Sequence, residues 1–217
     1  CFLFPFAGRD FFPSVDAGQL RLHVRAPAGT RLEESERYFA KVQDYLREQI
    51  PPEELNTMLD NIGIPNSGIN LSLSDGSQIS PADGEILIAL KENHHPTADY
   101  MRKFRKELPA KFPGLTFYFA PSDIATQVLN FGLPAPIDVQ ISGPKPNAEK
   151  NLAIAEDLRR QIAGVPGAVD VHIHQVSNTP DLRVVVDRTK ADQLGLSQRD
   201  VASDLLVSLS SSGQTSP

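Results

Sequence analysis

The stretch Gln19-Leu20-Arg21-Leu22-His23-Val24-Arg25 decides the fold, because its apolar residues occupy every second position. This period of two predicts a β-strand with one buried apolar face and one polar face. Residues 30–50 follow with apolar side chains at helical spacing. Thr30 and Glu33 match a capping box at the start of this predicted helix, and the pair Pro51-Pro52 ends it.

The next segments continue the alternation of strands and helices. Residues 55–62 and 85–91 are predicted strands, a second helix begins at Thr97, and residues 114–120 form a further strand. The order strand–helix–strand–strand–helix–strand is that of the ferredoxin-like βαββαβ unit. The sequence therefore predicts an α+β fold whose first subdomain spans residues 14–120.

A second pass of the same pattern follows a connector at residues 121–135. Within residues 136–209, strands are predicted at 137–141, 169–173 and 182–186, with helices beginning after Asn147 and Ser197. The closing strand of this second ferredoxin-like subdomain is missing, and residues 210–217 are a flexible tail leading to an insertion. Because an incomplete sheet leaves an unpaired edge, we expect the missing strand to come from later in a longer chain.

The first 13 residues are unusually apolar, beginning Cys1-Phe2-Leu3-Phe4-Pro5-Phe6. They are too short to span a bilayer, which takes about 20 apolar residues, and they lack the basic start and the cleavage site of a signal peptide. Two interpretations remain open, an N-terminal strand within a core and the end of a membrane helix. We favour the membrane helix.

Composition excludes several classes of function. The 21 basic and 27 acidic residues give a net charge of −6, which argues against a nucleic-acid partner. A single cysteine excludes an internal disulfide and any multi-cysteine metal site. No phosphate-binding, dinucleotide-binding or hydrolase motif is present, so we expect no catalytic residues, no cofactor and no enzymatic activity.

His172 and His174 lie two residues apart on one face of a predicted strand, where both side chains are able to reach one metal ion. No cysteine or third ligand at helical spacing accompanies them. Polar residues on the exposed face of a half-buried strand explain the pair without a ligand, so no metal site is expected.

Residues 63–84 form a long segment, rich in Gly, Ser, Asn and Asp, between two strands predicted to be neighbours. Loops of this length within a compact unit are usually functional or disordered. The segment is therefore interpreted either as a disordered insertion or as a mobile gate beside an apolar cleft.

Several stretches resemble resistance–nodulation–division (RND) efflux pumps. The residues from Phe11-Phe12-Pro13 to Gly18 look like the exit from a membrane helix, and Ala26-Pro27-Ala28-Gly29-Thr30 is similar to the family's entry into its first periplasmic helix. The stretch Val165-Pro166-Gly167-Ala168-Val169 is also similar to the family. The most specific match is Asp187-Arg188-Thr189-Lys190-Ala191, continuing to Ser197, which resembles the segment before the docking insertion.

The resemblance implies that the chain is part of the large periplasmic loop in the second half of a pump. Both subdomains would then be porter subdomains, with substrate bound between them. The implied gating loop contains Gly63, Pro65, Gly68 and Gly76. The candidate substrate-binding residues around it are Met58, Ile62, Ile64, Ile86 and Ile88, with ordinary core packing as the alternative for each.

Only two methionines, Met58 and Met101, are present. Because thioethers suit soft metal ions, this scarcity favours the hydrophobe/amphiphile branch over the heavy-metal branch. The resemblance further implies a proton-driven multidrug-resistance pump for hydrophobic or amphiphilic small molecules. It also implies a homotrimer, a periplasmic adaptor and an outer-membrane channel as partners, and placement as the periplasmic portion of a bacterial inner-membrane protein.

Three rival hypotheses remain. The first is a soluble ferredoxin-like module that binds a small molecule and regulates another process. The second is a cytosolic enzyme whose catalytic groups come from loops. The third, within the same family, is an exporter of lipids or hopanoids.

Overall fold

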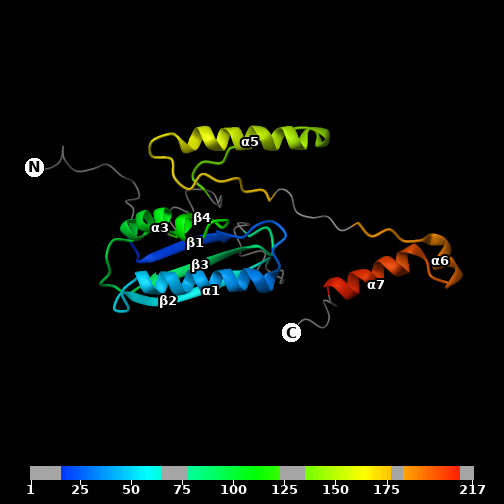
Figure 1. Ribbon diagram of the computed structural model, residues 1–217, viewed down its shortest axis with the longest axis horizontal. Helices are drawn as coiled ribbons and strands as arrows, with labels where there is room; N and C mark the ends of the chain where they lie inside the picture. Colours follow the sequence, from blue (N-terminus) through cyan, green and yellow to red (C-terminus); the bar gives the residue numbers. More distant parts are fainter. Residues whose placement is uncertain (1–15, 65–77, 123–134, 177–182, 211–217) are drawn as a thin grey trace, which may run out of the picture. The chain divides into compact units, whose positions relative to one another are not determined.

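Strand β1 (Gln19–Arg25) forms as predicted, in a computed structural model that describes residues 16–64, 78–122, 135–176 and 183–210. The elements that follow are α1 (Leu32–Gln49), β2 (Leu55–Ile62), β3 (Asp83–Leu90), α3 (Thr97–Lys111) and β4 (Thr116–Ala120). The four strands form one antiparallel sheet in the order β2-β3-β1-β4 (Figure 1). This confirms the ferredoxin-like order predicted for the first subdomain.

The hydrophobic core lies between this sheet and helices α1 and α3. Leu22 of β1 pairs with Ile86 of β3, and both side chains are fully buried. Helix α1 contributes Phe39 and α3 contributes Phe104 to the same cluster. Burying each such side chain contributes about 1.5–3 kcal/mol, so the alternation in β1 stabilises the subdomain through the face it turns toward the helices.

The start of α1 differs from the capping-box prediction. The helix begins at Leu32 after Arg31, and no side chain caps it. The Thr30 hydroxyl instead donates a hydrogen bond to the Pro27 carbonyl oxygen at 2.6 Å. The capping-box prediction was therefore wrong, because the hydroxyl closes the turn before the helix and is not available to its first turn.

A buried carboxylate positions the start of α3. Glu54, just before β2, accepts hydrogen bonds from the backbone N–H of His95 at 2.9 Å and from the Tyr100 hydroxyl at 2.7 Å. The His95 ring also contacts this carboxylate. These contacts connect α3 to the opposite edge of the sheet.

The second predicted subdomain shows helices but no strands in the described residues. A short 3-10 helix (Lys145–Asn147) leads into α5 (Ala148–Ala163), which buries none of its residues. Residues 137–141, 169–173 and the described part of 182–186 were predicted as strands, yet they are not paired into a sheet. A β-strand requires a neighbouring strand as its hydrogen-bonding partner, and none of these segments pairs with another strand among the described residues.

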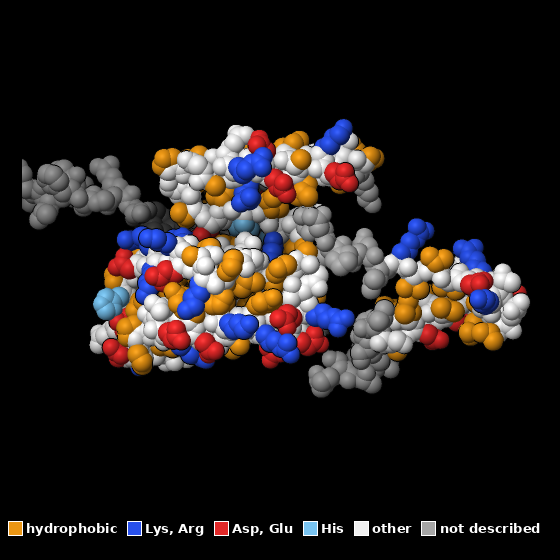
Figure 2. All heavy atoms as spheres, in the orientation of Figure 1, with side chains coloured by type: hydrophobic (Ala, Val, Ile, Leu, Met, Phe, Trp, Pro, Cys, Tyr) orange, Lys and Arg blue, Asp and Glu red, His pale blue; other side chains and the backbone are white. Residues whose placement is uncertain are grey.

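The chain divides into two compact units, residues 1–179 and 180–217. The second unit contains α6 (Arg188–Gln193) and α7 (Gln198–Ser210). The Asp187 side chain caps α6 by accepting hydrogen bonds from the backbone N–H groups of Thr189 and Lys190. Figure 2 shows apolar side chains at the surface of this unit, which include Val184, Val185, Leu194, Leu206 and Val207.

Several predicted segments lie outside the described residues. These are the apolar segment at 1–13, most of the connector at 121–135 and nearly all of the tail at 210–217. Among the helices that are described, none combines the length and the apolar character required to cross a bilayer.

Candidate functional site on the polar face of the sheet

The face of the sheet opposite the core carries charged and aromatic residues, and we call it the polar face. It is formed by Arg21, His23 and Arg25 of β1, Asp83 and Glu85 of β3, and Tyr118 of β4. The strand register places His23 opposite both Glu85 and Tyr118, and Arg25 opposite Asp83. The alternation in β1 predicts that this face is polar but does not predict its burial, and His23 and Asp83 are 0% exposed and Glu85 is 4% exposed. Another segment of the chain covers this face.

Two ion pairs join β1 to β3 on the polar face. Arg21 donates two hydrogen bonds to Glu85, from Nε at 3.0 Å and from a terminal nitrogen at 2.7 Å. Arg25 Nε donates to Asp83 Oδ1 at 2.5 Å. Bidentate and charge-assisted pairs of this kind are the strongest hydrogen bonds in proteins, and they allow the buried carboxylates to remain ionised.

Asp83 accepts hydrogen bonds from several directions. Besides Arg25, it receives the Ile79 backbone N–H at 3.1 Å and the Ser80 hydroxyl at 3.2 Å, and His23 Nε2 lies 3.3 Å from its Oδ1. Burial acts to raise the pKa of Asp83, but the contacts with His23 and Arg25 outweigh it and lower the pKa to about 2. Asp83 is therefore the ionised centre of this network.

Residues 169–174 cover the polar face at the β4 edge. Arg105 of α3 holds Asp170 through two parallel contacts, Nε to Oδ1 at 3.0 Å and a terminal nitrogen to Oδ2 at 2.5 Å. Arg25 also donates to the Ile173 carbonyl oxygen at 2.9 Å. Asp170 adopts a left-handed backbone conformation with φ of 57°, which aspartate tolerates better than most residues.

Three aromatic rings are stacked between the sheet and this covering segment. Tyr118 lies against His23 with ring centroids 4.3 Å apart, and against His172 with centroids 3.6 Å apart. The interplanar angles are 13° and 9°, so the rings are nearly parallel. Tyr118 is therefore sandwiched between a histidine of β1 and a histidine of the covering segment.

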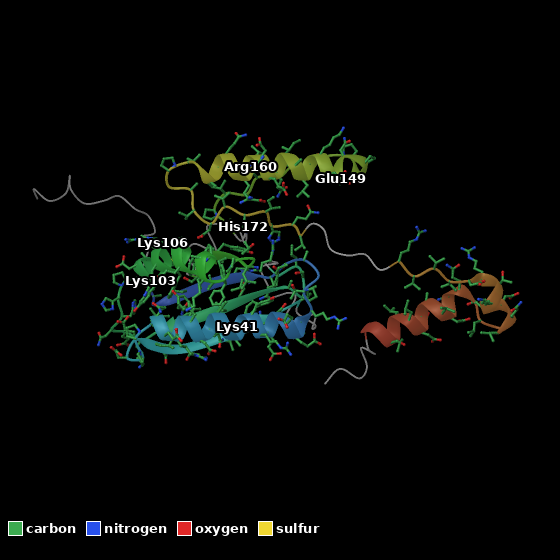
Figure 3. All side chains as sticks on the ribbon, in the orientation of Figure 1. Lys41, Lys103, Lys106, Glu149, Arg160 and His172 are labelled. Atoms are coloured by element: carbon green, nitrogen blue, oxygen red, sulfur yellow. The ribbon has the colours of Figure 1, made fainter. Side chains whose placement is uncertain are left out.

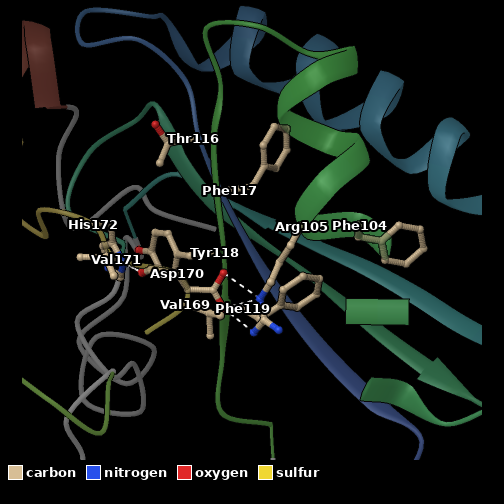
Figure 4. Close-up of a pocket in the computed structure, with 10 residues that line it drawn as sticks. All are labelled: Phe104, Arg105, Thr116, Phe117, Tyr118, Phe119, Val169, Asp170, Val171 and His172. Carbon is tan, nitrogen blue, oxygen red and sulfur yellow. Dashed lines mark hydrogen bonds and ion pairs between the residues drawn. The ribbon is translucent and has the colours of Figure 1, made fainter. Parts of the chain in front are cut away.

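A cavity of about 300 Å³ lies beside this stack (Figure 4). It is lined by residues of α3, β4 and the covering segment: Phe104, Arg105, Thr116, Phe117, Tyr118, Phe119, Val169, Asp170, Val171 and His172. Arg105 lies over the Phe119 ring at 5.3 Å. The lining thus combines aromatic surface with one charged pair, Arg105 and Asp170, and this is a surface suited to an organic ligand with a polar group.

The predicted substrate-binding residues do not line this cavity. Ile86 and Ile88 are buried in the core under α1 and α3, so the alternative of core packing applies to them. Met58 and Ile62 are half-buried and pack against the same core, whereas Ile64 is exposed. These five residues lie on β2, on β3 or just after β2, whereas the cavity is at the β4 edge.

The predicted gating loop is described only at its start. Gly63 follows β2, has φ of 82°, and donates a backbone hydrogen bond to the Asp83 carbonyl oxygen at 2.7 Å. Pro65, Gly68 and Gly76 lie outside the described residues.

His172 is held by two neighbouring groups. Nδ1 of His172 is 2.7 Å from the Asp170 carbonyl oxygen, and the ring is stacked on Tyr118. Across the described ranges, the side chains of His, Cys, Asp and Glu form no group of three or more that is placed to hold a metal ion.

The ion pairs of the polar face were not predicted, although the sequence contains a signal for them. Asp83 and Glu85 alternate on β3 just as Arg21 and Arg25 alternate on β1, with opposite charge. Two adjacent strands with complementary alternating charges indicate cross-strand ion pairs.

Comparison with known proteins identifies the class to which this fold and site belong. The sequence model of the AcrB/AcrD/AcrF family matches residues 1–216. The chain therefore belongs to this family of RND efflux transporters, as the resemblance in the sequence implied.

Two curated relatives illustrate the similarity. The "Cation efflux system protein CzcA" of Alcaligenes sp. (strain CT14) is 25% identical over 199 residues, which cover 89% of this chain and 18% of the relative. "Protein HelA" of Legionella pneumophila is 25% identical over 194 residues, which cover 87% of this chain and 17% of the relative. The chain thus spans less than a fifth of the length of these relatives.

The same fold occurs in solved structures. A crystal structure of a heavy metal efflux pump (crystal form II) matches 95% of this chain and 20% of its own chain, with a TM-score of 0.72 and 23% identity. Crystal form I matches the same share of this chain with a TM-score of 0.67. The fold is accordingly that of the ferredoxin-like porter subdomains of RND pumps.

Proposed function

We propose that residues 14–209 form the periplasmic porter segment of an RND efflux pump, through which cargo passes as it leaves a bacterial cell. The family match over residues 1–216 carries this proposal, and the likeness to solved pumps over 95% of the chain supports it. The segment performs no covalent chemistry. Its work is to bind cargo and to change conformation.

The contacts of the covering segment support a moving part at this position. Residues 169–174 are held against the first subdomain by the Arg105–Asp170 pair, by one hydrogen bond from Arg25 and by ring stacking. None of these is a strand pairing. Breaking them exposes the polar face but leaves the hydrophobic core of the first subdomain intact, so opening and closing here requires no unfolding.

For the cargo we propose hydrophobic or amphiphilic small molecules. Aromatic side chains of α3 and β4 supply adaptable apolar surface, and Arg105 and Asp170 supply a partner for a charged or polar group. Adaptable apolar pockets with few fixed polar groups favour a broad range of ligands. The loop that begins at Gly63 is proposed to control access to a deeper part of the path.

Metal cations are the second candidate cargo, and the relatives favour them. The matched relatives are described as a cation efflux protein and a cobalt-zinc-cadmium resistance protein, and the matched structure as a heavy metal efflux pump. The residues at the cavity offer this cargo little, because His172 is hydrogen-bonded and stacked and Asp170 is held by Arg105.

The family membership also supports a setting for the chain. We propose that it is the periplasmic part of a bacterial inner-membrane transporter that works as a homotrimer, with a periplasmic adaptor and an outer-membrane channel. Proton coupling is assigned to membrane helices outside these 217 residues.

An export assay tests the proposed function and separates the two cargoes. The full-length transporter gene is expressed in a bacterial strain that lacks its own pumps, and growth is measured in organic amphiphiles and in Zn²⁺, Co²⁺ and Cd²⁺. We expect protection against the amphiphiles. Val169→Trp narrows the cavity and should reduce this protection about tenfold, which corresponds to about 1.4 kcal/mol of binding.

A matched control is available close by. Val165 is exposed to a similar extent as Val169 but does not line the cavity, so Val165→Trp should leave protection unchanged. If the transporter protects the strain against the metal ions but not against the amphiphiles, metal cations are the cargo. Growth that does not depend on the transporter in any of these media contradicts the proposed function.

A further inference from the structure

The ring stack on the polar face is surrounded by charges that cancel in pairs. Arg21 pairs with Glu85, Arg25 with Asp83, and Arg105 with Asp170. Asp138 is a further carboxylate that acts on His174. The three pairs carry no net charge, and Asp138 is not among the groups that shift the pKa of His172. A proton on His172 therefore adds a positive charge near Arg25, while each carboxylate of the three pairs already has an arginine partner.

The contacts of His172 leave one ring nitrogen for this proton. Nδ1 is 2.7 Å from the Asp170 carbonyl oxygen, so an Nδ1–H donates to it and Nε2 remains unprotonated. Figure 3 shows His172 on the segment that follows α5, and its ring lies flat against Tyr118 of β4. Burial lowers the pKa of His172, the hydrogen bond with the Asp170 carbonyl oxygen opposes this, and Arg25, His23 and His174 lower the pKa further.

We propose that His172 and Tyr118 form a pH-sensitive clasp that holds residues 169–174 on the polar face while His172 is neutral and releases them when His172 is protonated. The clasp goes beyond the proposed function, because it is a property of these contacts whatever the cargo. In a transporter, the clasp would release the covering segment when the compartment that surrounds it becomes acidic.

The direction of the pH dependence follows from proton linkage. The closed state resists protonation of His172, whereas the open state protonates near the ordinary histidine pKa of 6.5. The closed state is therefore fully favoured above that pH. As the pH falls below 6.5, the open fraction rises by up to about tenfold per pH unit, until the pKa of the closed state is also passed.

Distance measurements between two spin labels test the clasp on the 217-residue chain. Lys103 on α3 and Gln175 beyond His174 are both exposed, and labels are attached at Lys103→Cys and Gln175→Cys after Cys1→Ser removes the natural thiol. We expect one short distance at pH 8 and an additional longer distance at pH 5. In His172→Phe, which preserves a flat ring but binds no proton, only the short distance should be present at both pH values.

Matched controls distinguish the clasp from a general effect of acid. His94 lies in the loop before α3, and His94→Gln should behave as the unmodified chain does. An NMR titration of the ring protons should place the midpoint of His172 below the ordinary histidine pKa of 6.5. Three outcomes would each overturn the proposal: distances that do not change with pH, a His172→Phe chain that opens at either pH, or a His172 midpoint at or above 6.5. The assay involves no transport, so its failure is separable from failure of the proposed function.

Discussion

Asp83→Ala is expected to lower the free energy of unfolding of the first subdomain by about 3–5 kcal/mol, the usual cost of removing one partner from a buried ion pair. The carboxylate has no exposed surface, and its loss leaves the Arg25 guanidinium without its strongest partner. The Ser80 hydroxyl and the Ile79 backbone N–H lose their acceptor as well. The midpoint of urea unfolding, followed by circular dichroism, measures the change.

An exposed aspartate serves as the control. Asp157 on α5 pairs with Arg160 at the surface, and Asp157→Ala should change the free energy of unfolding by no more than about 0.5 kcal/mol.

The pH dependence of stability offers a second check, because the pKa of Asp83 is lowered from 3.8 to about 2. Its ionised form stabilises the fold above pH 3.8, and this stabilisation is lost as the pH falls toward 2. The difference between Asp83→Ala and the unmodified chain should shrink over that interval. Equal urea midpoints at pH 7 would contradict the network described here.

The second large effect is expected at Gly84, where Gly84→Ala should lower the free energy of unfolding by about 2–3 kcal/mol. This is the upper part of the range of losses caused by overpacking a core. A Cβ atom here would lie 2.5 Å from Cζ of Phe39 and 2.7 Å from the Asn61 carbonyl oxygen. Phe39 is fully buried in the core, and the Asn61 oxygen belongs to the β2 backbone. Neither atom is able to move without disturbing the sheet. The same urea midpoint reports the loss.

Two further variants identify the cause. Gly164 ends α5, and the nearest atom to an added Cβ there is 3.4 Å away, so Gly164→Ala should be tolerated. The double variant Gly84→Ala/Phe39→Leu replaces the clashing ring with a smaller side chain. Its loss of unfolding free energy should be smaller than the sum of the losses of the two single variants. A Gly84→Ala chain as stable as the Gly164→Ala chain would show that the contact with Phe39 is not tight.

The first subdomain was predictable because each of its elements carries a local pattern that agrees with its neighbours. Leu20, Leu22 and Val24 alternate on β1, and Phe39 and Leu46 follow helical spacing on α1. The period of two also predicts that the other face of β1 is polar. It does not reveal that residues 169–174, far along the chain, bury that face. Coverage by a distant segment leaves no periodicity within β1 itself.

The segments predicted as strands in the second subdomain show the same limit of local sequence patterns. Ile137 and Val139 alternate with polar residues as convincingly as Leu20 and Leu22 do, yet Ile137 is 82% exposed and unpaired. Alternation describes the faces of a strand, whereas pairing depends on a partner with unsatisfied backbone groups. Local sequence therefore predicted the character of these segments but not their pairing in the described residues.

The predicted substrate-binding residues and the cavity lie in different parts of the fold. Ile86 and Ile88 were selected because they are apolar and lie near the loop that begins at Gly63. The same apolar character placed them in the core under the helices. The cavity is instead formed by Tyr118, Arg105 and Asp170, which come from three separate segments.

The proposed function requires residues 169–174 to move away from the first subdomain for cargo to pass. Cross-linking tests this most directly in the full-length transporter, with Cys1→Ser and the pair Arg105→Cys and Asp170→Cys joined by a reducible thiol-specific linker. Each single cysteine variant, treated with the same reagent, controls for modification alone. We predict that the cross-linked transporter does not export its cargo and that reduction of the linker restores export. Export at an unchanged rate by a fully cross-linked transporter would contradict this account.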